Sequence, residues 1–157
     1  MTVDEFLTVR PAVAADREPV AQMLAGMSDL TLYHRFQTPI RRPPRPAFVQ
    51  HLVCPDGDAW VAARGDQVVG HAMWAWVRDV ARPTAELAVI VAEGEQQRGL
   101  GARLLRAATE RAVAAGATQF LLIVGAGNDA VLRTVRRHWP AASAQWNGSL
   151  VNFTIPA

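Results

Sequence analysis

Hydrophobic and polar positions change their spacing several times along the chain. In roughly the first third, one short alternating strand precedes apolar residues three and four positions apart, which predicts helices with Asp16 and Ser28 as caps. Two alternating segments then flank Gly65-Asp66, which predicts a hairpin. The elements expected up to this point are a strand at 6–10, helices at about 16–26, 28–36 and 47–53, a proline-rich loop at 38–46, and strands at 59–64 and 67–77.

The second half of the chain alternates strands with helices, and Asn128 is the expected cap of the last helix. The elements expected here are strands at 84–91 and 119–124, helices at about 98–115 and after 128, and a final hairpin of 141–146 and 149–155 around Asn147-Gly148. This order predicts an α/β (α+β) fold, with helices on both faces of a mixed, mostly antiparallel sheet of about six or seven strands. The length of 157 residues predicts one domain, 1–157.

The basic residues set a first limit on function. All 16 of them are Arg, and the sequence contains no Lys. This excludes phosphate-binding loops of the P-loop kind and pyridoxal or Schiff-base chemistry, which require a Lys of the protein. The formal net charge is only +2, and no interleaving of basic and aromatic residues occurs, so we expect no nucleic-acid partner.

Cysteine and histidine predict no metal site. Cys54 is the only Cys, which excludes an internal disulfide and a zinc site built on paired cysteines. The histidines at 34, 51, 71 and 138 are never three to five residues apart. The sequence shows no secretory signal and no run of about 20 apolar residues. We therefore expect a cytoplasmic protein with no metal cofactor and no membrane partner.

The junction between the strand 84–91 and the next helix carries the most informative signal. The first backbone N–H groups of a helix have no partners within it and lie at the positive end of its dipole, so they bind phosphate oxygens. Gly99 and Gly101 would let such a ligand come close, and Arg98 would add a charged contact. Leu104 stands where a Rossmann motif needs its third glycine, so that reading is not favoured. Glycines needed only for packing are the alternative.

These residues resemble the GNAT superfamily of N-acetyltransferases. Gln96, Gly99 and Gly101 fill its acetyl-CoA motif, Gln/Arg-x-x-Gly-x-Gly/Ala. The resemblance covers nearly the whole chain, through residues 9–12 with Asp16, 68–70 and Asn128. More narrowly, 30–36 and 85–91 resemble the acetyltransferase domains of bacterial protein-lysine acetyltransferases.

The resemblance implies that acetyl-CoA is the co-substrate. Its pyrophosphate would lie on the N–H groups of about 98–102, its pantetheine along the edge of 89–91, and its thioester between that strand and 119–124. The residues expected to bind it are Val89, Ile90, Val91, Gln96, Gln97, Arg98, Gly99, Leu100, Gly101, Ala102 and Asn128. The family also forms dimers through its last strands, which makes a homodimer one expected state. Whether the acyl group is acetyl or longer stays open.

Glu86 is the expected general base. An attacking ammonium must lose a proton, and Glu86 is the only acid in the strand before the motif, where a charge is costly unless paired or used. A Glu at the matching position is the base in the lysine-acetyltransferase subgroup. Alternatively, Glu86 pairs with Arg78 or Arg82 at the strand edge. Where many GNAT members have a Tyr that protonates the thiolate, this chain has Val135, and Tyr33 is the only tyrosine that could substitute.

These features predict an enzyme: an acetyl-CoA-dependent N-acetyltransferase in which a primary amine attacks the thioester directly. A protein lysine is the leading acceptor, and a small amine such as a polyamine, amino acid or amino sugar is the second. A different class also fits, a non-catalytic acyl-CoA-binding regulatory module.

Overall fold

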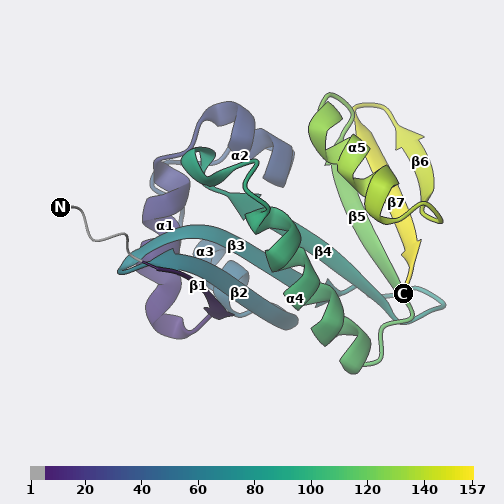
Figure 1. Ribbon diagram of the computed structural model, residues 1–157, viewed down its shortest axis with the longest axis horizontal. Helices are drawn as coiled ribbons and strands as arrows, with labels where there is room; N and C mark the ends of the chain where they lie inside the picture. Colours follow the sequence, from purple (N-terminus) through teal and green to yellow (C-terminus); the bar gives the residue numbers. More distant parts are fainter. Residues whose placement is uncertain (1–5) are drawn as a thin grey trace.

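The computed structural model of the protein describes residues 6–157. One seven-stranded sheet in the order β1-β2-β3-β4-β5-β7-β6 lies at its centre, with helices on both faces (Figure 1). Neighbouring strands are antiparallel except β4 and β5, which are parallel. The strands are β1 Leu7–Pro11, β2 Gly57–Arg64, β3 Gln67–Trp76, β4 Thr84–Val91, β5 Gln119–Gly125, β6 Ser143–Asn147 and β7 Leu150–Pro156.

The helices divide between the two faces of the sheet. The first three pack on one face, against β2 to β5, and α4 crosses β2, β3 and β4 on the other face, which it shares with α5. The helices are α1 Arg17–Ala25, α2 Asp29–Phe36, α3 Pro46–Val53, α4 Leu100–Ala114 and α5 Asp129–His138. No helix within residues 6–157 has the length and apolar character needed to cross a membrane.

Successive side chains of the strands point to opposite faces, which creates two hydrophobic cores. On β4, Leu87 packs toward α4, whereas Ile90 packs toward α1 and α3. Leu104 of α4 is fully buried in the first core, and Val20 and Leu24 of α1 are buried in the second. Burial on both faces holds β4 rigidly between the two layers.

The parallel pair β4 and β5 is hydrogen-bonded over a short distance only. Residues 84–86 match 119–121, and no further pairs follow within the described chain. Beyond Glu86, β4 continues to Val91 paired with β3 alone, whereas β5 continues to Gly125 paired with β7. The two strands therefore separate toward their C-terminal ends. The edge of β4 that faces β5 presents backbone groups without a sheet partner there.

The positions of strands and helices predicted from the sequence agree with the structure within a few residues. The strand at 84–91 has the predicted ends, and Ser28 caps α2 as expected by accepting the Thr31 N–H at 3.2 Å. Two expected caps are wrong. Asp16 and Asn128 occupy the N-cap positions, but neither side chain makes a cap hydrogen bond.

Asp16 instead stabilises the connection between β1 and α1. Its carboxylate accepts two hydrogen bonds from Arg10, at 2.7 and 2.8 Å, and the Val13 N–H at 2.7 Å. The hydrogen bonds from Arg10, and secondarily that from Val13, lower the pKa of Asp16 against the opposing effect of burial. Local donors on its N-terminal side thus outcompete the helix N–H groups for this side chain.

The last hairpin turns one residue later than predicted. Asn147 pairs with Leu150, so Gly148 and Ser149 form the turn rather than Asn147 and Gly148. Gly148 has a φ of 61°, a left-handed conformation that glycine adopts without the steric cost of a Cβ. The conformational freedom of this glycine is used at the first turn position instead of the second.

Gly57, at the beginning of β2, has no room for a side chain. An added Cβ would lie 2.1 Å from the carbonyl oxygen of Trp74 on β3. Because backbone would have to move, we expect Gly57→Ala to lower the free energy of unfolding by roughly 2 kcal/mol or more in urea denaturation. Gly127→Ala is the matched control, since no atom lies within 4 Å of its added Cβ. Equal losses in the two variants would contradict the prediction.

Candidate active site

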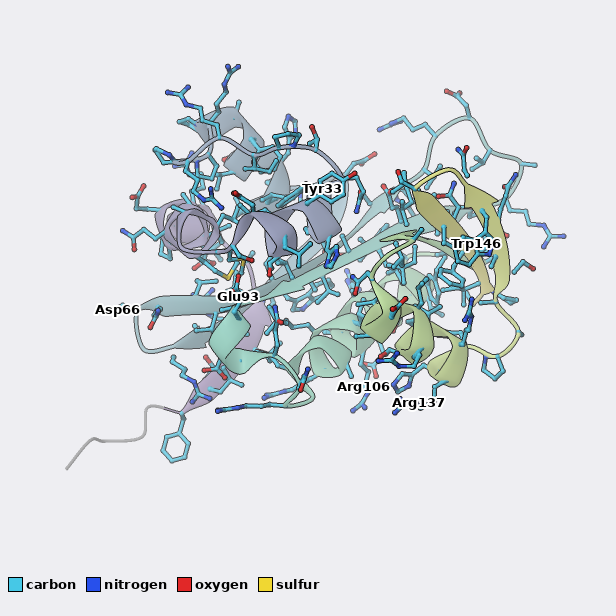
Figure 2. All side chains as sticks on the ribbon, turned by 90° about the horizontal axis from the view of Figure 1, so that it is seen from above. Tyr33, Asp66, Glu93, Arg106, Arg137 and Trp146 are labelled. Carbon is cyan, nitrogen blue, oxygen red and sulfur yellow. The ribbon has the colours of Figure 1, made fainter. Side chains whose placement is uncertain are left out.

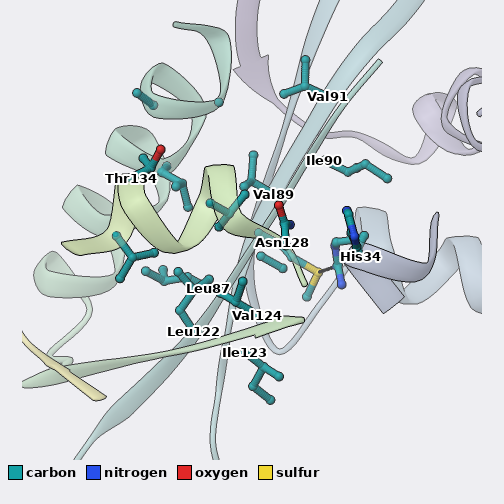
Figure 3. A pocket seen from close by; sticks show the side chains of 18 of the residues that line it. His34, Leu87, Val89, Ile90, Val91, Leu122, Ile123, Val124, Asn128 and Thr134 are labelled. Carbon is teal, nitrogen blue, oxygen red and sulfur yellow. Dashed lines mark hydrogen bonds between the residues drawn. The ribbon is translucent and has the colours of Figure 1, made fainter. Parts of the chain in front are cut away.

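A pocket of about 880 Å³ opens where β4 and β5 separate. Figure 3 shows labelled side chains of β4, β5, α5 and α2 surrounding it. We distinguish two halves. The α4 half is formed by the turn after β4 together with α4 and α5, and the α2 half is formed by α2, α3, Met73 and Glu86. The C-terminal parts of β4 and β5 run between them.

The turn between β4 and α4 presents backbone N–H groups to the α4 half. Gly99 is the N-cap of α4 and has a left-handed conformation, with φ at 82°. The first hydrogen bond of the helix joins the Arg103 N–H to the Gly99 carbonyl at 3.1 Å, so the N–H groups of Leu100, Gly101 and Ala102 have no partner within the helix. Positioned at the positive end of the helix dipole, these groups have the geometry that suits an anion.

Side-chain contacts hold this turn against the sheet. The Gln96 side-chain amide donates to the Val91 carbonyl at 2.9 Å, which ties the turn to the end of β4. Glu95 accepts two hydrogen bonds from Arg64 of β2, at 2.8 and 3.1 Å. These contacts from Arg64 lower the pKa of Glu95, since they favour its ionised form. The turn is therefore fixed before any ligand arrives, which reduces the entropy lost on binding.

Glu93 connects the same turn to α2. Its carboxylate accepts the backbone N–H of Ser28, the N-cap residue of α2, at 2.6 Å. Hydrogen bonding from Ser28 lowers the pKa of Glu93, so the carboxylate is ionised at neutral pH. Because α2 carries His34 and Arg35, this contact joins the two halves of the pocket mechanically.

Glu86 lies where β4 leaves β5, on the α2 half of the pocket. Its side chain is half-buried, on the same face of β4 as Ile90. The suggested pairing of Glu86 with Arg78 is wrong, because Arg78 pairs with Asp56. An ion pair between Glu86 and Arg82 is also absent from the described residues. The carboxylate thus faces the pocket without a fixed cationic partner.

Arg35 brings a positive charge into the α2 half. Its Nη2 lies 3.6 Å from the Met73 sulfur, and its guanidinium carbon lies 4.5 Å from the ring centre of Phe36. Its buried Nε has no hydrogen-bond partner in the part of the chain that the structure describes. Burial lowers the pKa of Arg35 to about 10, against the opposing electrostatic effect of Glu86. The guanidinium is therefore charged at neutral pH.

His71 of β3 lies beneath the α2 half and is 1% exposed. Its Nε2 is 2.8 Å from the Leu52 carbonyl, and since a carbonyl only accepts, Nε2 carries the proton. Burial, and secondarily the charge of Arg35, lowers the pKa of His71 to about 4, although the bond to Leu52 acts in the opposite direction. His71 is therefore neutral at pH 7 and hydrogen-bonded within the buried core.

The structure brings most of the predicted site residues together. Those that line the pocket are Glu86, Val89, Ile90, Val91, Gln96, Gln97, Gly99, Gly101, Ala102 and Asn128. Leu100 and Arg98 do not line it, because the Leu100 side chain is buried in the core and Arg98 is exposed. Val135 lines the pocket but has no proton to give. Tyr33 is 44% exposed on the surface of α2 (Figure 2) and does not line this pocket.

The fold and the turn agree with a known family. The family model of the acetyltransferase (GNAT) family matches residues 27–138, which include β4, the turn, α4 and α2. The chain belongs to the GNAT family. It is accordingly an N-acetyltransferase.

Solved GNAT structures share this fold. The GNAT domain of S. lividans PAT has a TM-score of 0.82 and 20% identity, over 95% of this chain and 89% of that chain. Ribosomal-protein-alanine N-acetyltransferase from Brucella melitensis has a TM-score of 0.69 and 20% identity, over 96% and 98% of the two chains. A GNAT family acetyltransferase from Brucella melitensis in complex with acetyl-CoA has a TM-score of 0.64 and 17% identity, over 97% and 88%. At identities this low, these TM-scores establish a common fold.

Sequence reasoning missed the side chains that α2 and α3 bring to this GNAT pocket. These are chiefly Arg35, Phe48 and His51. One signal was present, because Arg35 follows Leu32 by three residues and therefore lies on the buried side of α2. A charge on the apolar side of an amphipathic helix indicates a buried functional or structural contact.

His71 makes the stability of this GNAT protein depend on pH. Its folded-state pKa of about 4 lies below the ordinary value of 6.5, so the unfolded chain binds more protons between these values. The stability that comes from burying His71 in its neutral form is fully present above about pH 6.5 and is lost as the pH falls toward 4. We expect urea denaturation to show unfolding free energy falling over this range, and falling less in His71→Gln, whose amide also donates to Leu52. Identical pH profiles of the two proteins would contradict this assignment.

Proposed function

We propose that this GNAT protein transfers the acetyl group of acetyl-CoA to a primary amine, with Glu86 as general base. The observation that carries the proposal is the pocket that opens where β4 separates from β5. The turn with unpaired N–H groups lies at one end of this pocket, and the carboxylate of Glu86 lies at the other. A long thioester with a phosphate at one end fits between these two points.

The phosphate part of acetyl-CoA would bind at the turn. The N–H groups of Leu100, Gly101 and Ala102 would receive the pyrophosphate oxygens, and the unpaired edge of β4 at 89–91 would pair with the pantetheine amides. Arg98 is exposed beside the turn and is placed here only as an outer contact. Gln96 holds the turn through Val91 and contributes indirectly. Asn128, free of a capping role, would face the pantetheine from α5.

The reaction needs a base at the other end. An ammonium has no lone pair, so one proton must move to Glu86 before or during attack of the nitrogen on the thioester carbon. The carbon–sulfur bond then breaks, the nitrogen loses its second proton to water as the amide forms, and the thiolate of coenzyme A takes a proton. Val135 has no proton to donate and Tyr33 does not line the pocket, so we assign the proton that the thiolate takes to water.

We propose a protein lysine as the first acceptor to test and a small amine as the second. The resemblance of residues 30–36 and 85–91 to protein-lysine acetyltransferases supports the first. The α2 half, which Leu52 and Met73 line, supports the second because it offers a small amine an apolar wall beside Glu86.

Glu86→Gln should separate chemistry from binding. The amide keeps the shape of the side chain but cannot accept the proton, so we expect kcat for acetyl transfer to fall about 100-fold or more. Acetyl-CoA affinity, measured by calorimetry, should stay nearly unchanged. Glu110→Gln, on the exposed face of α4, is the control. Unaltered turnover in Glu86→Gln would remove Glu86 as the base. Acetyl-CoA binding without thiol release for any amine would favour the regulatory module instead.

Gly101 tests the position of the cofactor. An added Cβ would meet only the Val91 side chain, at 3.9 Å, so Gly101→Ala should fold and bind acetyl-CoA. The larger side chain of Gly101→Leu would extend into the α4 half of the pocket, and we expect calorimetry to show binding weakened by at least about 100-fold with an unchanged melting temperature. Retained affinity in Gly101→Leu would place the cofactor elsewhere.

A further inference from the structure

Arg35 is a charged group whose hydrogen-bonding capacity is little used by residues 6–157. A guanidinium has five N–H donors and no acceptor. Within the described residues its polar contacts are limited to the Met73 sulfur, a weak acceptor, and its buried Nε has no partner at all. The ring of Phe36 stacks on the cation and helps to fix its position. Because Arg35 also lines the pocket, its remaining N–H donors are open to a ligand there.

The neighbouring side chains do not supply the missing anion. His71 is neutral, with its proton directed to Leu52. Glu86 attracts Arg35 electrostatically but forms no ion pair with it in the described structure. Glu86 is also the one acidic side chain among the described residues that line the pocket. The α2 half therefore presents one negative and one positive group as separate attachment points.

We propose that Arg35 binds a carboxylate of the acceptor, close to the amine that Glu86 deprotonates. The inference rests on the proposed function and specifies its substrate class. The acceptor is an amine that carries a carboxylate, either a free amino acid or a peptide amine beside an acidic side chain. A planar guanidinium matches a carboxylate through two parallel hydrogen bonds, which gives orientation as well as affinity.

The charge balance also disfavours polycationic acceptors. A site for a polyamine or an amino sugar needs several carboxylates, whereas this pocket has Glu86 opposed by Arg35. A second cation of the acceptor would meet the buried guanidinium at close range in a medium of low polarity, where like charges repel strongly. The α2 half thus selects for an acceptor whose own charges are of both signs.

The test compares each carboxylate with its uncharged amide. The nineteen standard amino acids with a primary amine, and their amides, form one arm. Peptides with Lys-Asp or Lys-Asn form the other, so that the two sources of a carboxylate are distinguished. For the preferred source we expect kcat/KM for acetylation to be about 10- to 100-fold higher with the carboxylate than with the amide, mainly through KM. In Arg35→Gln that ratio should fall to near one while turnover of the amide is retained.

Three further variants keep the outcome interpretable. Arg35→Met removes the buried charge without leaving a polar group, which guards against a folding defect in Arg35→Gln. Arg35→Lys keeps the charge but loses the paired donors, so it should show an intermediate ratio. Arg82→Gln, in the exposed connection between β3 and β4, should retain the wild-type ratio.

Binding is measured separately from turnover. Thermal stabilisation of the coenzyme A-loaded protein by the same carboxylates and amides reports on Arg35 even if no amine is acetylated, a result that would overturn the proposed function alone. The proposal for Arg35 is overturned if the wild-type protein does not distinguish carboxylate from amide in either assay. It is equally overturned if the distinction survives in both Arg35→Gln and Arg35→Met.

Discussion

The active site depends on an interruption in the hydrogen bonding of the sheet. β4 and β5 pair from Thr84 to Glu86 and then part, because β5 continues along β7 while β4 stays with β3. Unpaired backbone groups at a sheet edge attract a partner. The gap between two otherwise well-packed strands therefore supplies both the space for an extended ligand and the main-chain groups that would hold it. Helix packing on both faces of β4 keeps that gap from closing.

The second requirement is a rigid turn at the open end of this gap. Gly99 supplies a left-handed N-cap, and Arg64 and Val91 anchor the side chains of Glu95 and Gln96. In this light the motif residue Gln96 has a structural role, since its amide is occupied by the strand. The phosphate site would consist of main-chain N–H groups, whose positions are set by helix geometry rather than by flexible side chains.

Local signals in the sequence were sufficient for most of the fold and for the α4 half of the site. The alternating and helical spacings placed β4 and α4, and the glycines at 99 and 101 marked the turn. These signals sufficed because a strand, a helix and a turn are each determined largely by residues close together in the sequence. The α2 half required tertiary information. Met73 comes near Arg35 only through the pairing of β3 with β4 and the packing of α2, and no local pattern encodes that distance. The capping expectations failed at Asp16 for a related reason, since Arg10 and Val13 compete for its carboxylate.

The hydrogen bond from Ser28 to Glu93 gives the two substrates a way to influence one another. Glu93 belongs to the turn that would receive the phosphates, and Ser28 begins the helix that carries Arg35. A ligand bound at the already fixed turn would restrain the first residue of α2 through this contact, and with it the helix that carries the guanidinium. By thermodynamic linkage the effect runs in both directions. Cofactor and acceptor would then bind cooperatively although the two ligands touch different helices.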